Sequence, residues 1–372
     1  MFTHKHLVAA MLTMGVVGTS TLSGQITNSA ASTNTQARAH AWWRDSGPGE
    51  RPYRHDNQKL PLISVKGNKF VEPSGDSVVL RGLCISDPDK IEMQGHWNKE
   101  LFEKVKEMGA TVVRIPVHPA AWRERTPREY IKLLGQAVGW CTELNMYVLL
   151  DWHSIGNLET GVFQNPMYDT SKQETYNFWR SMARHFAGHN TVAFWELFNE
   201  PTTYREQLGP VRWEDWEKTV EDEITMIRAY NPQAVVLVAG FDWAYDLTPI
   251  IVSPIGAQNI GYTVHPYAHK RSQPWEPKWE ENFGFAAAKY PVFATEFGGF
   301  EGEYGPHIMK YLEDKGISWC AWCFDPEWGP KLIKNWNYDL TPSGEFIKAA
   351  MKGESSLSEH GHVEPRQQTK SC

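Results

Sequence analysis

The chain has 372 residues, a formal net charge of −7 and an aromatic content of 13%. That length is enough for one large α/β domain with a sizeable core. The negative charge argues against a nucleic-acid partner, because phosphate binding needs a basic surface, and the absence of a polybasic run argues against a membrane surface as partner.

The first 31 residues predict a secretory signal peptide. Lys5 gives a short cationic start, the run from Leu7 to Val17 is mostly apolar but too short to span a membrane, and Ser29-Ala30-Ala31 offers a cleavage site. A disordered tail is the alternative interpretation. A signal peptide implies a secreted protein, extracellular or periplasmic, and a lipid anchor is not expected because no Cys lies near the cleavage site.

The segments that follow divide the chain by composition. Residues 32–60 are polar and predict a linker or an N-terminal arm without regular structure. Residues 61–77 contain short alternating runs around Gly67-Asn68, which predict a small β-hairpin. Residues 354–372 are polar and predict a disordered tail. No stretch inside 78–352 has the composition of a domain linker, so 61–353, hairpin included, is expected to form one catalytic domain.

Strand-like and helix-like segments alternate within that domain. The expected strands are 78–85, 111–118, 146–153, 192–200, 234–240, 260–267, 291–296 and 317–324. The expected helices include 98–108, 127–144, 172–189, 213–230 and 304–315. Helices between strands imply a parallel sheet, and eight such units favour a closed (β/α)8 TIM barrel over an open doubly wound sheet.

Five cysteines form no tight disulfide framework: Cys84, Cys141, Cys320, Cys323 and Cys372. Cys320 and Cys323 have the spacing of a CxxC motif, but their surroundings predict a strand, on which residues three apart face opposite sides. A disulfide or a shared metal between them is therefore not expected, and buried free thiols are the prediction. The odd count leaves one Cys unpaired in any pairing.

Polar residues gather toward the C-terminal ends of five expected strands. In 111–118, one parity holds Val113, Ile115 and Val117 and suits packing against outer helices. The other parity points Arg114 and His118 toward the barrel axis. The residues at corresponding places in other strands are Asp151, His153, Glu196, Asn199, Glu200, Thr263, His265, Tyr267 and Glu296. In a barrel these strand ends form the rim where active sites lie.

Each of these residues has a structural explanation of its own. Arg114 could form a core ion pair with Glu196 or Glu296, and a His at a strand end is often only hydrogen-bonded locally. However, burying a charge costs several kcal/mol unless it is paired. Stability alone gives no reason to gather carboxylates, imidazoles and a guanidinium at one rim.

Two carboxylates at one rim are what the cleavage of a glycosidic bond requires. One carboxyl group protonates the leaving oxygen, and the other attacks the anomeric carbon. An Arg and a Tyr hydroxyl can hold the nucleophile ionised and aimed, and a His near the acid/base can tune its proton affinity. An Asn beside the acid/base can bind a sugar hydroxyl.

The segment Trp195-Glu196-Leu197-Phe198-Asn199-Glu200-Pro201 resembles the acid/base signature of glycoside hydrolase family 5, the family of many cellulases. The resemblance covers about 61–352 and continues in chain order at the family's other positions, which are occupied by Arg114, His153, His265, Tyr267, Glu296 and Trp322. It implies that Glu200 is the acid/base and Glu296 the nucleophile. The implied substrate-binding residues are Arg114, His153, Asn199, His265, Tyr267 and Trp322.

The same resemblance implies a secreted, retaining endo-β-1,4-glucanase that uses double displacement and needs no cofactor or metal. A monomer acting on a β-linked polysaccharide is expected. Mannan, xyloglucan and mixed-linkage glucan stay open as substrates, because similar proteins use the same catalytic residues on them. A non-catalytic carbohydrate-binding barrel is an alternative of another class, but it would be expected to lack one of the catalytic positions. A metal site made of His153, His265 and Glu200 is a minor alternative.

The 17 Trp residues predict either a Trp-rich core or a groove in which indole faces contact pyranose rings. Trp243, Trp275 and Trp328 are the candidates for sugar platforms, with core packing as the alternative. Loop residues 154–172, 201–212 and 268–280 are expected to line the cleft.

Overall fold

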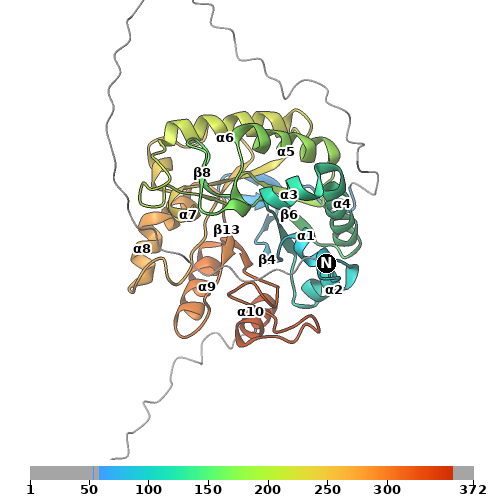
Figure 1. Cartoon of the computed structure of the whole chain (residues 1–372). Helices are drawn as coiled ribbons and strands as arrows, with labels where there is room; N and C mark the ends of the chain where they lie inside the picture. Colours follow the sequence, from blue (N-terminus) through green and yellow to red (C-terminus); the bar gives the residue numbers. More distant parts are fainter. Residues whose placement is uncertain (1–52, 54–57, 355–372) are drawn as a thin grey trace, which may run out of the picture. The chain divides into compact units, whose positions relative to one another are not determined.

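The computed structural model describes Tyr53 and residues 58–354. The predicted signal peptide, most of the 32–60 stretch and the tail beyond residue 354 lie outside the described residues. Within the described part, eight parallel strands close into one barrel in the order β11-β12-β13-β14-β4-β5-β6-β9 (Figure 1). The predicted (β/α)8 TIM barrel is confirmed.

The barrel strands are β4 (Arg81–Cys84), β5 (Val112–Val117), β6 (Tyr147–Trp152), β9 (Val192–Glu196), β11 (Val235–Ala239), β12 (Ile260–Thr263), β13 (Val292–Phe297) and β14 (Ser318–Ala321). All eight overlap the expected strands. Three predictions continue too far, because the chain leaves the barrel ladder after Glu196, Thr263 and Ala321. The residues that follow these three strand ends form part of the rim.

Helices surround the barrel (Figure 1). The five predicted ones are α2 (Lys99–Glu107), α4 (Pro127–Glu143), α5 (Lys172–His185), α6 (Trp213–Arg228) and α9 (Tyr304–Lys315). The elements that were not predicted are α1 (Pro88–Met93), α3 (Pro119–Arg125), η2 (Pro166–Tyr168), α7 (Phe241–Ala244), η3 (Thr248–Ile251), α8 (Trp275–Asn282), η4 (Gly284–Ala288) and α10 (Pro342–Lys352). Side-chain caps define several helix starts. The Ser171 hydroxyl, for example, accepts a hydrogen bond from the Glu174 amide at the start of α5.

The predicted hairpin is present as β1 (Ser64–Lys66) and β2 (Lys69–Val71), and β3 (Ser77–Val78) extends it to three antiparallel strands. Phe70 of this sheet meets Phe194 edge to face, with ring centroids 5.0 Å apart, and lies 6.1 Å from the Phe293 ring. Phe194 is the middle residue of β9 and Phe293 is the second residue of β13, so neither lies at the C-terminal end of its strand. The small sheet therefore covers the end of the barrel opposite the rim.

The core has the two layers that strand alternation predicts. Val113, Ile115 and Val117 pack with the outer helices, whereas Leu149 and Phe293 belong to the separate cluster inside the barrel. Because this apolar cluster fills the interior of the barrel, polar side chains gather at the C-terminal ends of the strands. The site residues expected from the sequence lie at these ends.

The four described cysteines are buried free thiols, as predicted: Cys84, Cys141, Cys320 and Cys323. The expectation that Cys320 and Cys323 face opposite sides is wrong, since both belong to the cluster inside the barrel. The alternation does not extend to Cys323 because β14 ends at Ala321. Cys372 lies outside the described residues. Between residues 58 and 354, no helix combines the length and apolar character that crossing a membrane would need.

Candidate active site

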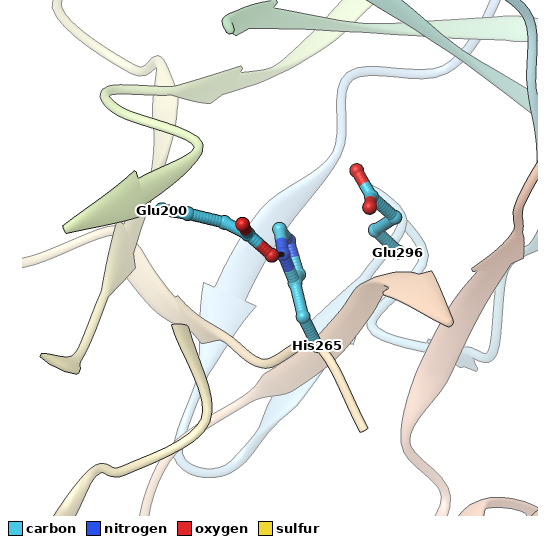
Figure 2. Close-up of side chains that lie close together, drawn as sticks. All are labelled: Glu200, His265 and Glu296. Carbon is cyan, nitrogen blue, oxygen red and sulfur yellow. Dashed lines mark hydrogen bonds and ion pairs between the residues drawn. The ribbon is translucent and has the colours of Figure 1, made fainter. Parts of the chain in front are cut away.

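The two carboxylates singled out in the sequence meet at the rim of the barrel. Glu200 begins β10 (Glu200–Pro201), which pairs with β7 (Ile155–Asn157) above the barrel, and Glu296 lies near the end of β13. Glu200, Glu296 and His265 each offer an atom within 4.8 Å of the others (Figure 2). Both carboxylates are 7% exposed, so each is accessible only from the cleft.

Glu296 is held by two donors. Arg114 Nη1 lies 2.8 Å from Glu296 Oε2, and the Tyr267 hydroxyl donates to Oε1 at 2.6 Å. Burial, together with the Glu296 carboxylate, raises the pKa of Tyr267 well above its usual value. The phenol therefore keeps its proton and acts as a donor. This pair of contacts fixes the orientation of the carboxylate.

Arg114 connects several acidic groups beneath the rim. Its Nε lies 2.6 Å from Glu196 Oε2, and its Nη2 lies 2.7 Å from Asn199 Oδ1 and 2.9 Å from Asp151 Oδ2. Burial lowers the pKa of Arg114, but Asp151 and Glu196 outweigh it and the net shift is upward. Both core ion pairs considered from the sequence are present, and they are part of the site itself.

Glu196 lies below Glu200 and Glu296 and bonds several neighbouring side chains. Burial raises the pKa of Glu196, but the opposite effect of Arg114 and His265 is larger, and the net result is a pKa lowered to about 2. The hydroxyl groups of Thr295 and Thr263 donate to its Oε1 at 2.6 and 3.1 Å. Glu196 thus stays ionised and holds Arg114 in place. Its strand parity revealed an inward position, but not this bonding role.

The acid/base candidate lies beside two groups that carry or can accept a proton. His265 Nδ1 is 2.9 Å from Glu200 Oε1, and Nε2 of the same ring is 3.1 Å from Thr295 Oγ1. Lys270 Nζ lies 3.8 Å from Glu200 Oε1. Burial raises the pKa of Glu200, but Lys270 and His265 outweigh it and the net shift is downward.

Lys270 was not among the site residues predicted from the sequence. It lies in the loop after β12, beyond the end of the strand, where alternation no longer indicates which side chains face the axis. The only available signal was a basic residue three positions after Tyr267.

His153 and Trp322 form the opposite wall of the site. Their rings are stacked, with centroids 5.6 Å apart and an interplanar angle of 3°. Asp151 Oδ2 lies 2.5 Å from His153 Nδ1, while burial holds the pKa of His153 well below its usual value. The imidazole is therefore neutral at neutral pH and suits a hydrogen-bonding role. Trp322 Nε1 donates to the Gly329 carbonyl at 3.1 Å, which fixes the indole ring.

Asn199 has an unused donor. Its Oδ1 accepts from Arg114, whereas its Nδ2 is buried and has no hydrogen-bond partner among the described residues. A buried amide hydrogen without a partner is costly unless something else binds it. A sugar hydroxyl in the cleft can supply that partner.

The structure thus places all eight predicted site residues at one rim.

The cleft around these residues has a volume of about 1220 Å³. All three expected loops contribute to its wall, through Tyr168, Tyr204, Lys270 and their neighbours. Trp243 lines this cleft. Trp328 lines an adjoining hollow of about 420 Å³ together with His118 and Met167. The His118 ring contacts both Trp328 and Tyr168, at centroid distances of 5.2 and 5.7 Å, so the two hollows share a wall.

The expectation of a sugar platform does not hold for Trp275. Its ring stacks on Trp279 at 6.2 Å and meets Tyr304 edge to face at 5.3 Å. Trp275 does not line the cleft but a separate hollow bordered by Glu303 and His307. Packing against neighbouring aromatic residues, the alternative considered from the sequence, describes this residue.

One group of side chains among residues 58–354 has the proximity that a shared metal ion would need, and it consists of Glu200, His265 and Glu296. These are the catalytic candidates themselves, and His153 is not part of the group. Arg114 and Tyr267 already engage Glu296, and Lys270 lies beside Glu200. Two adjacent cations oppose a third, so the residues present do not fit a metal centre.

Known proteins with similar sequences belong to one enzyme family. Residues 71–327 match the family described as Cellulase (glycosyl hydrolase family 5). The chain is 25% identical to an endoglucanase of Clostridium saccharobutylicum over 80% of its own length and 66% of that protein. It is 25% identical to endoglucanase A of Butyrivibrio fibrisolvens over 70% of its length and 59% of that protein. The chain therefore spans less than two thirds of these two relatives.

Solved structures extend the comparison. A β-glucanase from Saccharophagus degradans, crystallised with cellotetraose, is 39% identical, with a TM-score of 0.79 over 84% of this chain and 98% of that one. The catalytic domain of an endoglucanase from Thermobifida fusca shares the fold at 20% identity, with a TM-score of 0.66. The family match spans the barrel strands and includes Glu200 and Glu296, and the chain belongs to glycoside hydrolase family 5.

Proposed function

We propose that this protein is a retaining endo-β-1,4-glucanase in which Glu296 is the nucleophile and Glu200 the acid/base. The observation that carries the proposal is the pair of carboxylates at one rim, with oxygen atoms within 4.8 Å of each other. Retaining enzymes place these carboxyl groups about 5–5.5 Å apart, whereas inverting enzymes leave about 6.5–9.5 Å for a water molecule. The close approach favours retention.

In this proposal each carboxylate has a step of its own. Glu296, oriented by Arg114 and Tyr267, attacks the anomeric carbon and forms a glycosyl ester. Glu200 gives its proton to the departing oxygen, and the bond between that oxygen and the anomeric carbon breaks. In the second step, Glu200 takes a proton from water, the resulting hydroxide adds to the anomeric carbon, and Glu296 leaves as a carboxylate.

Three further residues suit sugar binding. The unpartnered Nδ2 of Asn199 can donate to a hydroxyl beside the reacting carbon. The neutral imidazole of His153 can exchange a hydrogen bond with another hydroxyl, and the indole of Trp322 offers an apolar face for a pyranose ring. The site thus contains binding groups as well as reacting ones.

The proposed substrate is a β-1,4-glucan. Support comes from the endoglucanases among the relatives and from the related β-glucanase that was crystallised with cellotetraose. The cleft of about 1220 Å³ adjoins a second hollow lined by Trp328, which favours attack within a chain over removal of single end units. A soluble cellulose derivative should lose viscosity before much reducing sugar appears. A much higher rate on mannan or xyloglucan would move the assignment to that polymer.

The roles of the two carboxylates can be separated by mutation. Glu296→Ala should be nearly inactive on every substrate because the attacking group is missing. Glu200→Ala should still form the intermediate from an aryl glycoside with a good leaving group, and it should then stall. Azide needs no base, so it should restore turnover of Glu200→Ala and give a β-glycosyl azide. An α-glycosyl azide, or no rescue at all, would contradict the assignment.

Secretion and the domain boundaries complete the proposal. We infer that residues 1–31 are a signal peptide removed on export, that 32–60 is a linker or arm, and that 61–353 is the catalytic domain. The cationic start, the apolar run and the small residues within the first 31 positions support export. Sequencing the N-terminus of the protein recovered from the culture medium or periplasm should place the cleavage near Ala31. An intact N-terminus on cytoplasmic enzyme would contradict export.

A further inference from the structure

The Glu200 side of the cleft contains a cation that the proposed mechanism does not use. The side chain of Lys270 is only 9% exposed, and its Nζ lies 3.8 Å from Glu200 Oε1. The same ammonium group donates to the Trp243 carbonyl and lies 3.5 Å from the Asp242 carbonyl. It also lies 5.9 Å from the centre of the Tyr245 ring. Because a buried ammonium group is costly, such a complete set of partners indicates a fixed position.

The carbonyl partners of Lys270 belong to a turn with unusual backbone geometry. Asp242, Trp243 and Ala244 have φ values of 56°, 56° and 54°, in the left-handed region that residues other than glycine rarely adopt. A run of three such residues persists only where its surroundings hold it. The segment after β12 does so, through Lys270 and through Arg271, whose Nη2 lies 2.8 Å from Asp242 Oδ2.

This turn carries Trp243 to the cleft. The Trp243 Nε1 donates to Gln164 Oε1 at 2.8 Å, and its ring meets Tyr204 edge to face at 5.5 Å. Tyr204 follows Glu200 by four residues, and Lys270 lies between Glu200 and the turn. Trp243 therefore stands on the Glu200 side. Since Glu200 protonates the departing oxygen, this side receives the sugar that leaves.

We propose that Lys270 is a positioning residue for the leaving-group half of the site, with two roles. Its charge stabilises the carboxylate form of Glu200, and its hydrogen bonds fix the turn that presents Trp243 to the departing sugar. This inference rests on the proposed role of Glu200 as acid/base. It names a residue and a structural link that the two-carboxylate mechanism leaves out.

The charge of Lys270 has opposite effects on the two steps. In the first step Glu200 must be protonated, and the neighbouring cation opposes protonation. In the second step Glu200 must be ionised to accept a proton from water, and the cation favours that form. Once Glu296 is esterified, its negative charge no longer opposes the effect of Lys270 on Glu200. The ammonium group then stabilises the ionised form of Glu200 without that opposition. Lys270 therefore supports the change of Glu200 from acid to base.

Other groups also act on Glu200. His265 and Lys270 are nearest, and the more distant ones are Arg114, Asp151, Tyr168, Tyr267, His269 and Glu296. Those around Lys270 itself are Glu200, Asp242, Glu296 and Arg271. Burial raises the pKa of Glu200, and Lys270 is the largest influence in the opposite direction. Removal of the Lys270 charge should therefore raise that pKa.

The test uses Lys270→Met, which removes both charge and hydrogen bonds, and Lys270→Gln, which removes the charge but keeps a donor. With cellohexaose as substrate, kcat/KM is measured as a function of pH. Its fall on the alkaline side reports the loss of the proton from Glu200 in the free enzyme. For 2,4-dinitrophenyl β-cellobioside, whose leaving group needs no acid, the acid limb of kcat reports ionised Glu200 in the intermediate. Both limbs should move to higher pH in both variants. If either variant fails to fold, the other still carries the test.

Arg271→Met is the matched control, because Arg271 holds the turn through Asp242 and is not among the described groups that act on Glu200. It should leave both limbs in place. Like Lys270→Met, it should raise KM for cellohexaose more than for the aryl cellobioside. A uniform loss of rate in Lys270→Met and Lys270→Gln with unmoved limbs would overturn the electrostatic role. An unchanged KM for cellohexaose in Lys270→Met and Arg271→Met would overturn the role in holding Trp243.

The Glu200→Ala variant separates this inference from the proposed function. If azide rescues Glu200→Ala and the limbs of the Lys270 variants do not move, only the inference about Lys270 fails. If azide does not rescue Glu200→Ala, the acid/base assignment fails, and the role of Lys270 fails with it.

Discussion

At the scale of single residues, the proposed nucleophile Glu296 depends on two donors that orient its carboxylate. Arg114 and Tyr267 each contact a different oxygen of Glu296. Arg114 also bonds three other site residues, so its removal would disturb the whole rim. Tyr267 offers a cleaner test, because the loss of one hydroxyl group leaves its ring in place.

Tyr267→Phe should lower kcat/KM without unfolding the enzyme. A hydrogen bond to a charged group contributes about 1.5–3 kcal/mol, which corresponds to about a 10- to 100-fold loss of rate if the bond matters most in the transition state. Steady-state kinetics on a cello-oligosaccharide, with thermal unfolding as control, would measure it. Activity within about twofold of the wild type would contradict the role given to this hydroxyl.

Glu223 is a buried acid that takes no part in the site. It lies in α6 without exposure, and neither of its carboxyl oxygens has a hydrogen-bond partner among the described residues. Burial, with a smaller contribution from Asp222, raises its pKa well above 4.5. A raised pKa in the folded state means that the acid contributes stability below about pH 4.5, its unfolded value, and loses it as pH rises.

Glu223→Gln should therefore become more stable relative to the wild type as pH rises above about 4.5. Thermal unfolding measured at several pH values would reveal a growing difference in Tm between the two proteins. The exposed residue Glu221 of the same helix provides the control, and Glu221→Gln should show no such trend. A difference in Tm that is constant with pH would contradict a buried, protonated Glu223.

At the scale of elements, alternation predicted which strand residues face inward, and it failed where strands end. The parity of β5 placed Val113 outside and Arg114 inside. Beyond Thr263 and Ala321, however, the chain leaves the ladder, so parity could not place Lys270 or Cys323. Their positions depend on turns and on contacts between distant loops, which a local pattern does not contain.

Helices show the same division. The long amphipathic helices such as α4 and α6 have a clear repeat, and they were predicted within a few residues. Short elements such as α1 and α3 have six and seven residues, too few for a repeat to emerge. The site residues were predictable because each lies at or near a strand end within a recognisable motif. Lys270 has neither advantage.

Ser171→Ala tests a local start signal. The Ser171 hydroxyl accepts from the Glu174 amide at 3.1 Å at the start of α5. Its loss should reduce the free energy of unfolding by about 0.5–2 kcal/mol, while Ser171→Asp should retain the cap. Urea unfolding would measure both variants. Equal losses for Ala and Asp would show that the cap does not stabilise this helix.

At the scale of the whole molecule, the barrel separates stability from chemistry. Its interior is filled by an apolar cluster and is covered at one end by the β1–β3 sheet. All eight predicted site residues lie at the other end. Changes in the apolar cluster should therefore act through folding, whereas changes at the rim should act through rate.

The whole enzyme should work without a metal ion, because its acid, base and nucleophile are all side chains. Exhaustive treatment with a chelator, followed by assay on a soluble cellulose derivative, should leave activity unchanged. Loss of activity that added metal restores, with no change in Tm on chelation, would contradict the two-carboxylate mechanism. A parallel loss of Tm would instead indicate a structural ion.

In the proposed mechanism Glu296 forms a covalent glycosyl-enzyme, so that two inversions restore the original configuration of the anomeric carbon. Proton NMR can follow the anomeric signal of the first product released from a cello-oligosaccharide, before mutarotation sets in. The β-anomer should appear first, and the α-anomer should follow only at the rate of spontaneous mutarotation. Initial release of the α-anomer would mean direct attack by water and would contradict the assignment of Glu296 as nucleophile.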